Sequence, residues 1–415
     1  MKTKQKNPIK SLNPLKFLSI LRQRNKNFKK ASAQNVPEIY PLNEIANILH
    51  PAKQFVKISD IKENSADCKT FTLSPNSEKG TKNLAYFSAG QYISVNLEID
   101  GKKTNRAYSL CSSPKMSLST KDEGKNIYQI TVKAAKDGLV SNYILKNWKV
   151  GQNLEISSPE GSFSYVGLRD AKTVICLAGG SGITPFFSMA QSILDGSEDF
   201  NMILLYGNRD ESSILFQDEF NKIQSETKKI KVVYVLSDEK NPQVFEKNPN
   251  YEKGFINSQI IQKFAPKDEK FSIFICGPQA MYNFLDKELE NLHLEKKYIR
   301  REAFGEIHNA KLFKDYPSCS LNSVQIKVKI LNKIETIYGS PNNTILQILE
   351  SGGIQVPSRC RSGECAWCRS YLKSGKVWVP QNLDFRRKAD LVYNYIHPCC
   401  TFPLSDLEIE ISPSE

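Results

Sequence analysis

Long apolar runs and histidines are scarce in this chain of 415 residues. No stretch of eighteen consecutive apolar residues occurs, so the sequence predicts no transmembrane helix. The four histidines, His50, His293, His308 and His397, form neither a 2-His-1-carboxylate pattern nor a haem-ligand pattern. We therefore expect no oxygen-activating site within the chain. Internal repeats at the periods typical of solenoid proteins are also absent.

Acidic residues are missing from the first 37 positions, which hold ten Lys or Arg. The formal net charge of +13 is concentrated in this arm, because the rest of the chain has 47 basic against 44 acidic residues. A nearly neutral body gives no indication of nucleic-acid binding. Leu12, Leu15, Leu18 and Leu21 recur at every third position and predict a short amphipathic helix.

The role of this basic arm stays open among four interpretations. Its composition suits an organelle transit peptide, contact with a membrane surface, docking to an acidic redox partner, or an extension without a dedicated role. A secretory signal peptide is not expected, because Lys16 interrupts the apolar segment and no small-residue cleavage site follows.

The ten cysteines follow no disulfide framework. Without a secretory signal, this cysteine usage indicates a reducing, cytoplasmic compartment. Five of the cysteines lie in apolar strand or loop contexts: Cys68, Cys111, Cys176, Cys276 and Cys319.

The other five cysteines form the most specific motif of the chain. Cys360, Cys365 and Cys368 have the spacing C-x4-C-x2-C, and Cys399-Cys400 follows about thirty residues later. This is the ligand spacing of a plant-type [2Fe-2S] cluster, which is held by deprotonated thiolates. A structural zinc site is the alternative, although zinc ribbons usually present two C-x2-C knuckles.

Two hydrophobic patterns divide the part of the chain before this motif. From about Phe55 to Tyr165, short alternating runs are separated by Gly, Pro, Asn and Ser clusters, which predicts an antiparallel barrel with a tight turn at Asp100-Gly101. From Lys172 onward, apolar strands alternate with helical periods, which predicts a parallel α/β sheet. The expected strands of this sheet are 173–177, 202–206, 231–236, 272–276 and 298–301, and the expected helices lie near 183–195, 214–227, 257–264 and 278–292.

Glycines follow the first apolar strand of the parallel sheet. Gly179, Gly180 and Gly182 precede Thr184-Pro185 at the start of a predicted helix. Such a turn lets the backbone approach a pyrophosphate, and the helix N-terminus attracts its negative charge. A purely structural turn is the alternative, because this motif alone is weak evidence.

Two short runs in the first half of the chain match flavin-binding stretches: Arg106-Ala107-Tyr108-Ser109 and Gly138-Leu139-Val140-Ser141. With the glycine turn and the cysteine motif following in this order, the chain resembles the ferredoxin–NADP reductase superfamily. The arrangement is similar to that of oxygenase reductase components with a C-terminal plant-type ferredoxin domain. The resemblance covers about residues 54–412.

The resemblance implies a multidomain fold. After the basic N-terminal extension (1–53), it implies an FAD-binding antiparallel β-barrel (54–168) and an NAD(P)H-binding α/β domain with a parallel sheet (169–308). A linker (309–322) then leads to a β-grasp-like α+β [2Fe-2S] ferredoxin domain (323–415).

The resemblance also implies roles for the barrel residues. Arg106 would hold the flavin phosphate, Tyr108 would pack on the isoalloxazine, and Ser109 would hydrogen-bond near the reactive flavin nitrogen. Ser141, with the backbone of Gly138, Leu139 and Val140, would bind the pyrophosphate. The run after Ser109 resembles family members that use FAD rather than FMN.

On the nicotinamide side, Cys276-Gly277-Pro278 ends an apolar strand, where ligands of open α/β sheets bind. The resemblance places Cys276 beside the nicotinamide. The alternative is that Cys276 is a small, buried hydrophobic residue with a purely structural role. Glu302, in Glu302-Ala303-Phe304, is implied to belong to the hydride-transfer site. The adenosine ribose has two candidate segments, Asn208-Arg209 and Ser237-Asp238, and the acidic residue favours NADH over NADPH.

At the cluster, the resemblance implies Cys360, Cys365, Cys368 and Cys399 as the ligands. It places the fourth ligand at the first of two adjacent cysteines, because the segment from Cys399 to Asp406 resembles the closing run C-x3-P-x-S-D.

Basic residues around this loop are a second feature of the motif. Arg359, Arg361 and Arg369 are expected to raise the cluster's potential. The basic segment 384–388 departs from the common family pattern and leaves the acceptor open.

The implied activity is that of an NAD(P)H-dependent flavoprotein reductase. Hydride passes from NAD(P)H to FAD, and single electrons pass through the [2Fe-2S] cluster to a separate acceptor protein, either an oxygenase or another reductase component. The alternative is a non-catalytic redox sensor or electron-transfer subunit of a larger complex.

Overall fold

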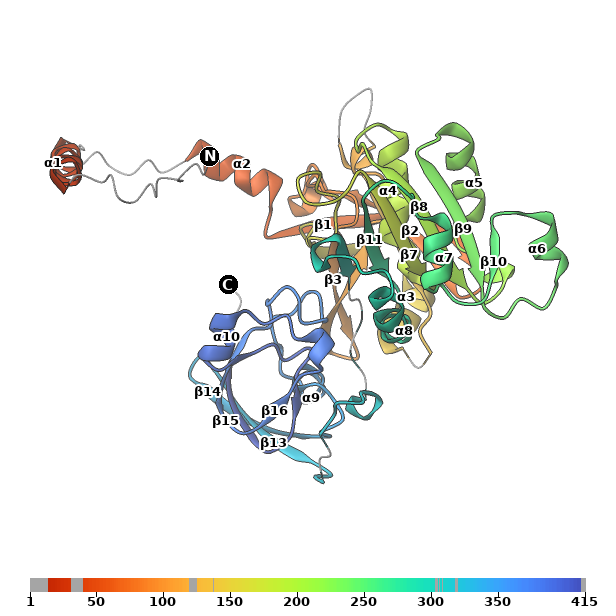
Figure 1. Ribbon diagram of the computed structural model, residues 1–415. Helices are drawn as coiled ribbons and strands as arrows, with labels where there is room; N and C mark the ends of the chain where they lie inside the picture. The colour runs from red at the N-terminus through yellow and green to blue at the C-terminus, as the bar shows by residue number, and fades with distance from the viewer. Residues whose placement is uncertain are drawn as a thin grey trace, which may run out of the picture. The chain divides into compact units, whose positions relative to one another are not determined.

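The computed structural model describes residues 14–30, 40–118, 125–136, 138–302, 305, 307, 309–317 and 320–411. The chain divides into two compact units, Met1–Asn47 and Ile48–Glu415. The first unit contains α1 (Pro14–Lys30) and most of α2 (Pro41–Leu49) (Figure 1). The helix expected in the basic arm corresponds to α1, although Leu12 lies outside the described residues, and α2 was not predicted. None of the described helices is both long and apolar enough to cross a bilayer.

The second unit begins with a six-stranded antiparallel sheet in the order β4-β3-β6-β1-β2-β5. An isolated bridge between Leu110 and Ile130 joins the chain after β4 to β5 and curls the sheet into a half-barrel. The predicted tight turn is present, because Asp100 and Gly101 have φ angles of 50° and 75° between β3 and β4. The elements are β1 (Lys53–Ser65), β2 (Cys68–Pro75), β3 (Tyr92–Ile99), β4 (Lys102–Ser109), β5 (Tyr128–Lys133), α3 (Leu139–Asn147) and β6 (Asn153–Ser157).

A six-stranded parallel sheet follows, in the order β10-β9-β8-β7-β11-β12. Every residue of β7 is buried, as expected for a central strand covered by helices on both faces. The strand order reverses between β7 and β11, and ligands of such sheets bind at this switch point. The strands are β7 (Thr173–Gly179), β8 (Asn201–Asn208), β9 (Ile230–Leu236), β10 (Tyr251–Lys253), β11 (Phe271–Cys276) and β12 (Ile299–Glu302).

The helices of this domain agree with the predicted ranges to within a few residues. They are α4 (Thr184–Leu194), α5 (Gln217–Glu226), α7 (Ser258–Phe264) and α8 (Gln279–Glu290). The short elements β10 and α6 (Gln243–Lys247) were not predicted.

The C-terminal domain contains a five-stranded mixed sheet in the order β14-β13-β19-β15-β17. Strand β13 is parallel to β19, and the other pairs are antiparallel. Helix α9 (Ile345–Ser351) packs on this sheet, and its N-terminus is capped by Thr344 and Gln347. The other elements are β13 (Val324–Ile330), β14 (Lys333–Gly339), β15 (Ser370–Ser374), β16 (Val377–Trp378), α10 (Lys388–Val392), β17 (Tyr395–Ile396), β18 (Phe402–Pro403) and β19 (Leu407–Ile411).

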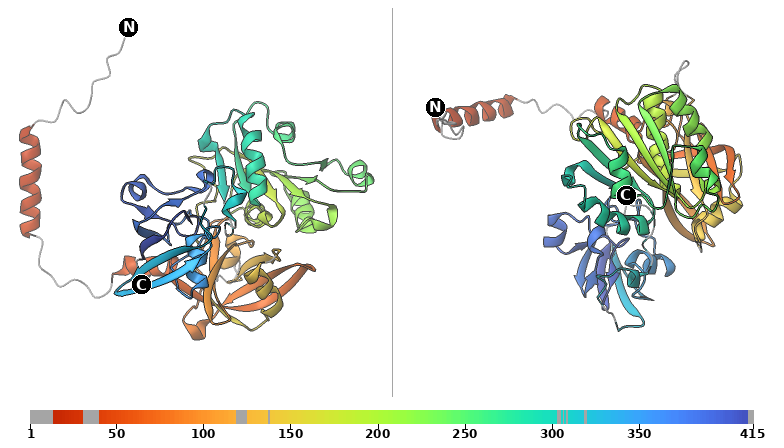
Figure 2. Two further views of the ribbon diagram at one scale, coloured as in Figure 1. Left: turned by 90° about the horizontal axis from the view of Figure 1, so that it is seen from below. Right: turned by 45° about the vertical axis from the view of Figure 1, so that its right-hand side comes forward.

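The three larger sheets occupy residues 53–157, 173–302 and 324–411, which Figure 2 distinguishes by colour as orange, yellow-green to teal, and blue. Strands β16 and β18 form a separate two-stranded sheet within the last range. The exact domain boundaries stay predictions. Short 3-10 helices occur at Ser77–Lys79, Pro114–Ser117, Gly180–Ile183, Glu211–Ser213, Lys296–Tyr298, Ala310–Leu312 and Gln381–Leu383.

Helix α4 and strand β12 hold the barrel against the parallel sheet. Ser188 Oγ donates to the Ser112 carbonyl at 2.6 Å, and Gln191 Nε2 donates to the Cys111 carbonyl at 2.7 Å. From β12, the nearly buried Arg300 pairs with Asp170 at 2.9 Å and donates to the Ser162 and Ser164 carbonyls. These contacts fix the carboxyl edge of the parallel sheet beside the barrel.

Candidate functional site

The glycine turn after β7 leads directly into α4. At Gly180 φ is +52°, and an added Cβ would meet nothing within 4 Å, so this side of the turn is open to a ligand. At Gly182 an added Cβ would lie only 2.2 Å from the Cys276 carbonyl oxygen. Thr184 and Pro185 begin α4, which has no side-chain cap. This cradle and helix terminus fit a phosphate group.

Three neighbouring strands end at one edge beside this turn. In β7, β11 and β12, Ala178, Cys276 and Glu302 are register partners. The predicted residues Cys276 and Glu302 are therefore neighbours, and Gly277 and Pro278 follow Cys276 into α8.

Glu302 is the most unusual group at this edge. It is 2% exposed, and its Oε2 has no hydrogen-bond partner among the described residues. Burial, reinforced by the negative charge of Glu364, raises the pKa of Glu302 well above its usual range. Burial likewise raises the pKa of the Cys276 thiol. Glu302 thus combines a raised pKa with a buried carboxyl oxygen that is available to a ligand. The neighbouring Ala303 and Phe304 lie outside the described residues.

The predicted flavin motif lies on β4, an antiparallel neighbour of β3. Arg106, Tyr108 and Ser109 stand opposite Val95, Ile93 and Tyr92, respectively. The Arg106 guanidinium donates to Thr104 Oγ1 at 2.9 Å and to the Asn105 carbonyl at 2.7 Å. Ser109 is buried, Ala107 and Tyr108 are half-buried, and burial raises the pKa of Tyr108. The strand therefore presents a guanidinium, an aromatic ring and a hydroxyl within four consecutive residues.

The second flavin-like run forms the start of α3. Gly138 precedes the helix, and an added Cβ there would lie 2.7 Å from Ser141 Oγ. Ser141 Oγ accepts a hydrogen bond from the Ala135 backbone N–H at 3.1 Å, so the hydroxyl hydrogen can still be donated. Leu139 is exposed and Val140 is buried. This helix N-terminus also fits a phosphate.

The two candidate segments for the adenosine ribose are joined by their backbones. The N–H groups of Ser237 and Asp238 donate to the carbonyls of Asn208 and Arg209 at 3.0 and 2.8 Å. Asp238 also forms an exposed ion pair with Lys240. Charges of both signs are therefore present at this corner. Asp238 favours NADH over NADPH less strongly when Lys240 is beside it.

The cysteine loop directs backbone N–H groups at its sulfurs. Gly363 N–H lies 3.1 Å from Cys399 Sγ, Cys365 N–H lies 3.4 Å from Cys360 Sγ, and Cys368 Sγ lies 3.4 Å from Cys399 Sγ. Hydrogen bonds from the Cys365 and Cys399 thiols lower the pKa of Cys360, and the same contacts raise the pKa of Cys365 and of Cys399. The loop reaches this form through positive φ angles of 57° at Arg361, 88° at Gly363 and 59° at Ala366.

This donor set fits a [2Fe-2S] cluster, because N–H donors stabilise thiolate sulfur. Cys400 differs from its neighbour, since its Sγ donates to the His397 carbonyl at 3.4 Å. In the described part of the chain, no three His, Cys, Asp or Glu side chains surround one point as a single-ion site requires. A two-iron cluster does not need this geometry, because its four thiolates are shared between two irons.

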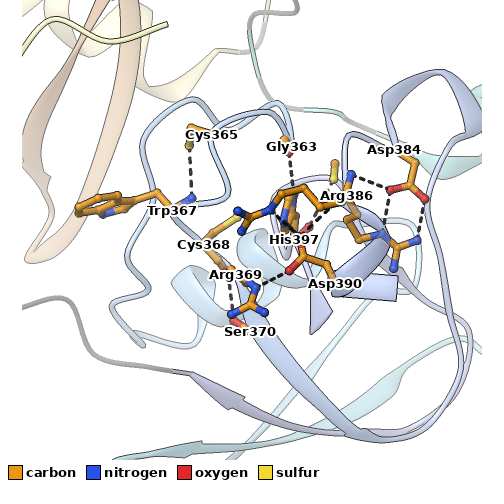
Figure 3. A network of polar contacts seen from close by, with 12 residues as sticks. Gly363, Cys365, Trp367, Cys368, Arg369, Ser370, Asp384, Arg386, Asp390 and His397 are labelled. Carbon is orange, nitrogen blue, oxygen red and sulfur yellow. Dashed lines mark hydrogen bonds and ion pairs between the residues drawn. The ribbon is translucent and has the colours of Figure 1, made fainter. Parts of the chain in front are cut away.

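A buried polar network supports the loop from behind (Figure 3). His397 Nδ1 donates to the Gly363 carbonyl at 2.7 Å, and burial lowers the pKa of this histidine. Asp390 of α10 is buried, accepts a hydrogen bond from Arg369 Nε at 2.5 Å, and lies 3.9 Å from His397 Nε2. The segment that carries Cys399 is thus tied through His397 to the loop that carries the other three cysteines.

The loop also contacts the barrel. Arg361 is 1% exposed and forms a bidentate ion pair with Glu350 at 2.8 and 2.6 Å. Its guanidinium and Ser358 Oγ also reach Asn105 Oδ1, at 3.4 and 3.1 Å. Asn105 immediately precedes Arg106, so the cysteine loop meets the strand that carries the flavin motif.

Glu364 extends the loop toward the parallel sheet. It hydrogen-bonds Ser162 and lies near Arg300 and Glu302. Burial and the negative charge at Cys360 raise the pKa of Glu364 to about 7. The loop, the barrel and the edge of the parallel sheet therefore meet at one junction.

The three loop arginines each have a carboxylate partner, and their effect on the cluster's potential stays a prediction. Arg359 pairs with Glu160, Arg361 with Glu350 and Arg369 with Asp390. Each guanidinium is therefore paired with a carboxylate. Sequence reasoning missed these carboxylates because each comes from a different element, and no spacing connects them to the motif. Of the residues missed here, only Asn105 could have been found from the sequence, because it stands next to Arg106 of the flavin motif.

Family models match the three domains in the order found in the structure. An oxidoreductase FAD-binding domain matches residues 55–165, an oxidoreductase NAD-binding domain matches 176–287, and a 2Fe-2S iron-sulfur cluster binding domain matches 328–404. The zinc alternative is thereby set aside for the C-terminal domain.

Similar proteins share this organisation. The glycine betaine monooxygenase reductase subunit of Pseudomonas aeruginosa is 26% identical over 337 residues, covering 79% of this chain and 88% of that protein. The ferredoxin reductase component of the 3-ketosteroid-9-alpha-monooxygenase of Rhodococcus rhodochrous is 26% identical over 361 residues, covering 85% and 95%. The solved structure of phthalate dioxygenase reductase has the same fold, with a TM-score of 0.56, 23% identity, and coverage of 87% of this chain and 98% of that one.

Proposed function

This chain belongs to the ferredoxin–NADP reductase superfamily as an NAD(P)H-dependent flavoprotein oxidoreductase with a [2Fe-2S] domain, and on this premise we propose that it is the reductase component of an oxygenase system. In this role it takes electrons from NAD(P)H and delivers them singly to a separate oxygenase. When bound, FAD accepts the two electrons of a hydride, and the cluster carries one electron at a time.

The observation that carries this proposal is the position of the cysteine loop. Arg361 and Ser358 contact Asn105, beside the flavin motif. Glu364 lies near Glu302, at the edge where the nicotinamide site is proposed. A loop that touches both other domains supports electron transfer within one chain. An electron-transfer subunit without its own NAD(P)H site would not need the open glycine turn beside this edge.

We assign the chemistry of the first two domains as follows. Arg106 binds the flavin phosphate, Tyr108 packs against the ring system and Ser109 hydrogen-bonds to it, while Gly138–Ser141 bind the pyrophosphate. Cys276 and Glu302 line the hydride-transfer site. The nucleotide is held by Gly179, Gly180, Gly182, Thr184, Pro185, Asn208, Arg209, Gly277 and Pro278.

We assign the cluster to Cys360, Cys365, Cys368 and Cys399. The support is the set of N–H groups directed at three of these sulfurs and the short approach of Cys368 to Cys399. Cys400 is left out because its thiol points to the His397 carbonyl.

For the donor we propose NADH, since Asp238 favours a ribose hydroxyl over a phosphate, with Lys240 as the group that weakens the preference. We propose a cytoplasmic location, which suits the nine described cysteines, all free thiols. For the basic arm we propose contact with a membrane surface or a partner. In α1 the exposed Leu18 and Ile20 stand beside Arg22 and Arg24.

Anaerobic titration of the purified protein with NADH, and separately with NADPH, tests this function. We expect flavin and cluster absorption bands to bleach together within the mixing time, and the faster nucleotide is the donor. Full cofactor loading with slow turnover on artificial acceptors would favour a redox sensor instead. Flavin that bleaches while the cluster bands persist would contradict electron transfer within the chain.

A further inference from the structure

An exposed apolar surface lies on α10 and the residues around it, on the segment that departs from the family pattern. We call this surface the α10 face: Phe385, Arg387, Lys388, Leu391, Val392 and Tyr393. Its four apolar side chains are 43%, 50%, 72% and 65% exposed for Phe385, Leu391, Val392 and Tyr393. Single exposed apolar residues are common, but a cluster of this kind is typical of a binding surface.

The α10 face is fixed in place rather than frayed. A helix of five residues is too short to be stable alone. Asp390 supplies the anchor, because its buried carboxylate pairs with Arg369 and caps the helix through the Arg387 backbone. Solvent therefore faces a surface that the protein holds in one conformation, which reduces the entropic cost of binding.

The anchor of the α10 face is also connected to the cluster loop. Asp390 lies 3.9 Å from His397, whose other ring nitrogen donates to the Gly363 carbonyl. The Gly363 N–H in turn points at Cys399 Sγ at 3.1 Å. A protein bound to this face would be connected to Cys399 Sγ through Asp390, His397 and Gly363. Electron transfer rates fall steeply with distance, so this is a favourable place for an acceptor.

The cysteine loop itself is already in contact with the barrel. The contacts to the barrel come from Ser358, Arg359 and Arg361, and none of these residues belongs to the α10 face. Electrons entering from the flavin side and leaving at α10 would use different surfaces of the domain.

The charge of the α10 face selects the kind of partner. Between Phe385 and Asn394 the exposed charged residues are Lys388 and Arg387, and the Arg387 guanidinium lies 3.4 Å from the buried carboxylate of Asp390. Because Asp390 also pairs with Arg369, the group keeps a net positive charge. An apolar centre with a basic rim is complementary to an apolar patch rimmed by carboxylates.

We propose that the α10 face is the docking surface for the electron acceptor, and that the acceptor presents an apolar patch with an acidic rim. This inference rests on the proposed function, because it identifies where the electrons of that reaction leave. It commits to a redox protein as the occupant, and a second copy of this chain is the competing occupant that the test must exclude.

The test compares two triple variants of the full-length holoprotein. The first is Lys388→Glu/Leu391→Ser/Val392→Ser, on the α10 face. The matched control is Lys333→Glu/Ile334→Ser/Tyr338→Ser on β14, where the same kinds of exposed side chain occur in the same domain. All six sites are exposed, so both variants should fold and keep their flavin and cluster spectra.

The readout is NADH-driven reduction of three probes. These are cytochrome b5, whose surface is acidic, cytochrome c, whose surface is basic, and ferricyanide, which needs no docking surface. We expect the α10 variant to reduce cytochrome b5 about tenfold more slowly than wild type at low ionic strength. Its rate with ferricyanide should stay within about twofold of wild type, as should all rates of the control variant. Added salt should slow the reduction of cytochrome b5 by wild type and narrow the difference in rate between wild type and the α10 variant.

Four outcomes would overturn the proposal. Equal rates of the α10 variant and wild type with cytochrome b5 would show that this face does not dock the acceptor, while the proposed function would stand. Equal slowing by the β14 control would show that the effect is not specific to α10. A wild-type dimer that the α10 variant dissociates, measured by light scattering, would assign the face to self-association. If wild type reduces ferricyanide but neither cytochrome, the proposed function itself fails and the docking face with it.

Discussion

Replacing Glu350 by Gln tests how strongly the cysteine loop depends on its buried ion pair. Glu350 on α9 holds both terminal nitrogens of Arg361, at 2.8 and 2.6 Å. Arg361 lies between Cys360 and Ser362 and is 1% exposed. Its charge therefore cannot be compensated by water when the carboxylate is removed.

The structure sets the size of the expected effect. Breaking a buried ion pair by removing one partner costs about 3–5 kcal/mol, because the other charge is left buried. Glutamine keeps one acceptor oxygen for the guanidinium, so we expect the lower value, about 3 kcal/mol. At about 4–8 °C for each kcal/mol in a domain of this size, the melting temperature should fall by at least about 12 °C.

Thermal loss of the cluster absorption, followed beside far-ultraviolet circular dichroism, measures this change. Glu410→Gln is the matched control, since it breaks the exposed pair of Glu410 with Lys329 in the same domain. We expect the control to lose no more than about 1 kcal/mol. Cluster bands that melt at the wild-type temperature in Glu350→Gln would refute the claim that this pair stabilises the loop.

Three further changes test other parts of the site. In Gly182→Ala the new Cβ would lie 2.2 Å from the Cys276 carbonyl oxygen, so we expect weaker NADH binding in a fluorescence titration and a stability loss of about 1–3 kcal/mol. An unchanged affinity would contradict the close approach. Burial raises the pKa of Glu302, so charging it destabilises the fold above its unfolded pKa of about 4.3. The melting temperature of Glu302→Gln should therefore rise relative to that of wild type as pH increases from about 5 to about 8. The variant should also oxidise NADH more slowly. If the melting temperatures of the two proteins change with pH in parallel, a strongly raised pKa of Glu302 is excluded. Cys399→Ser should lose the cluster absorption and Cys400→Ser should retain it, and the reverse result would make Cys400 the fourth ligand.

Most of the fold could be predicted from the sequence because its signals are local. The parallel strands β7, β8, β9 and β11 are mostly apolar runs, and each lies within a few residues of the expected range. The turn at Asp100-Gly101 follows from the tolerance of these residues for positive φ. The elements β10 and α6 were missed, because neither is long enough to carry a clear hydrophobic period. The nine-residue helix α2 was also missed, although it is longer than α7, which was predicted.

The candidate site was only partly predictable, for a different physical reason. Cysteine spacing and glycine turns are contiguous motifs, and they point directly to Cys360–Cys368 and Gly179–Gly182. The carboxylates Glu160, Glu350 and Asp390 are isolated acidic residues, and only the packing of the domains brings them to the loop. Ion pairs between residues far apart in the sequence produce no periodic pattern from which they could be predicted.

The pairing of the loop arginines changes the argument about what sets the cluster's potential. An unpaired cation acts on a nearby charge over several ångströms, whereas a guanidinium bound to a carboxylate acts as a dipole whose field falls off faster. The nearest fixed donors are then the backbone N–H groups of Ser362, Gly363, Cys365 and Trp367, at 3.1–3.5 Å from sulfur. Their directions depend on the loop backbone, including its positive φ angles. Changes in the potential should therefore follow changes in loop conformation more closely than changes in the number of basic residues around it.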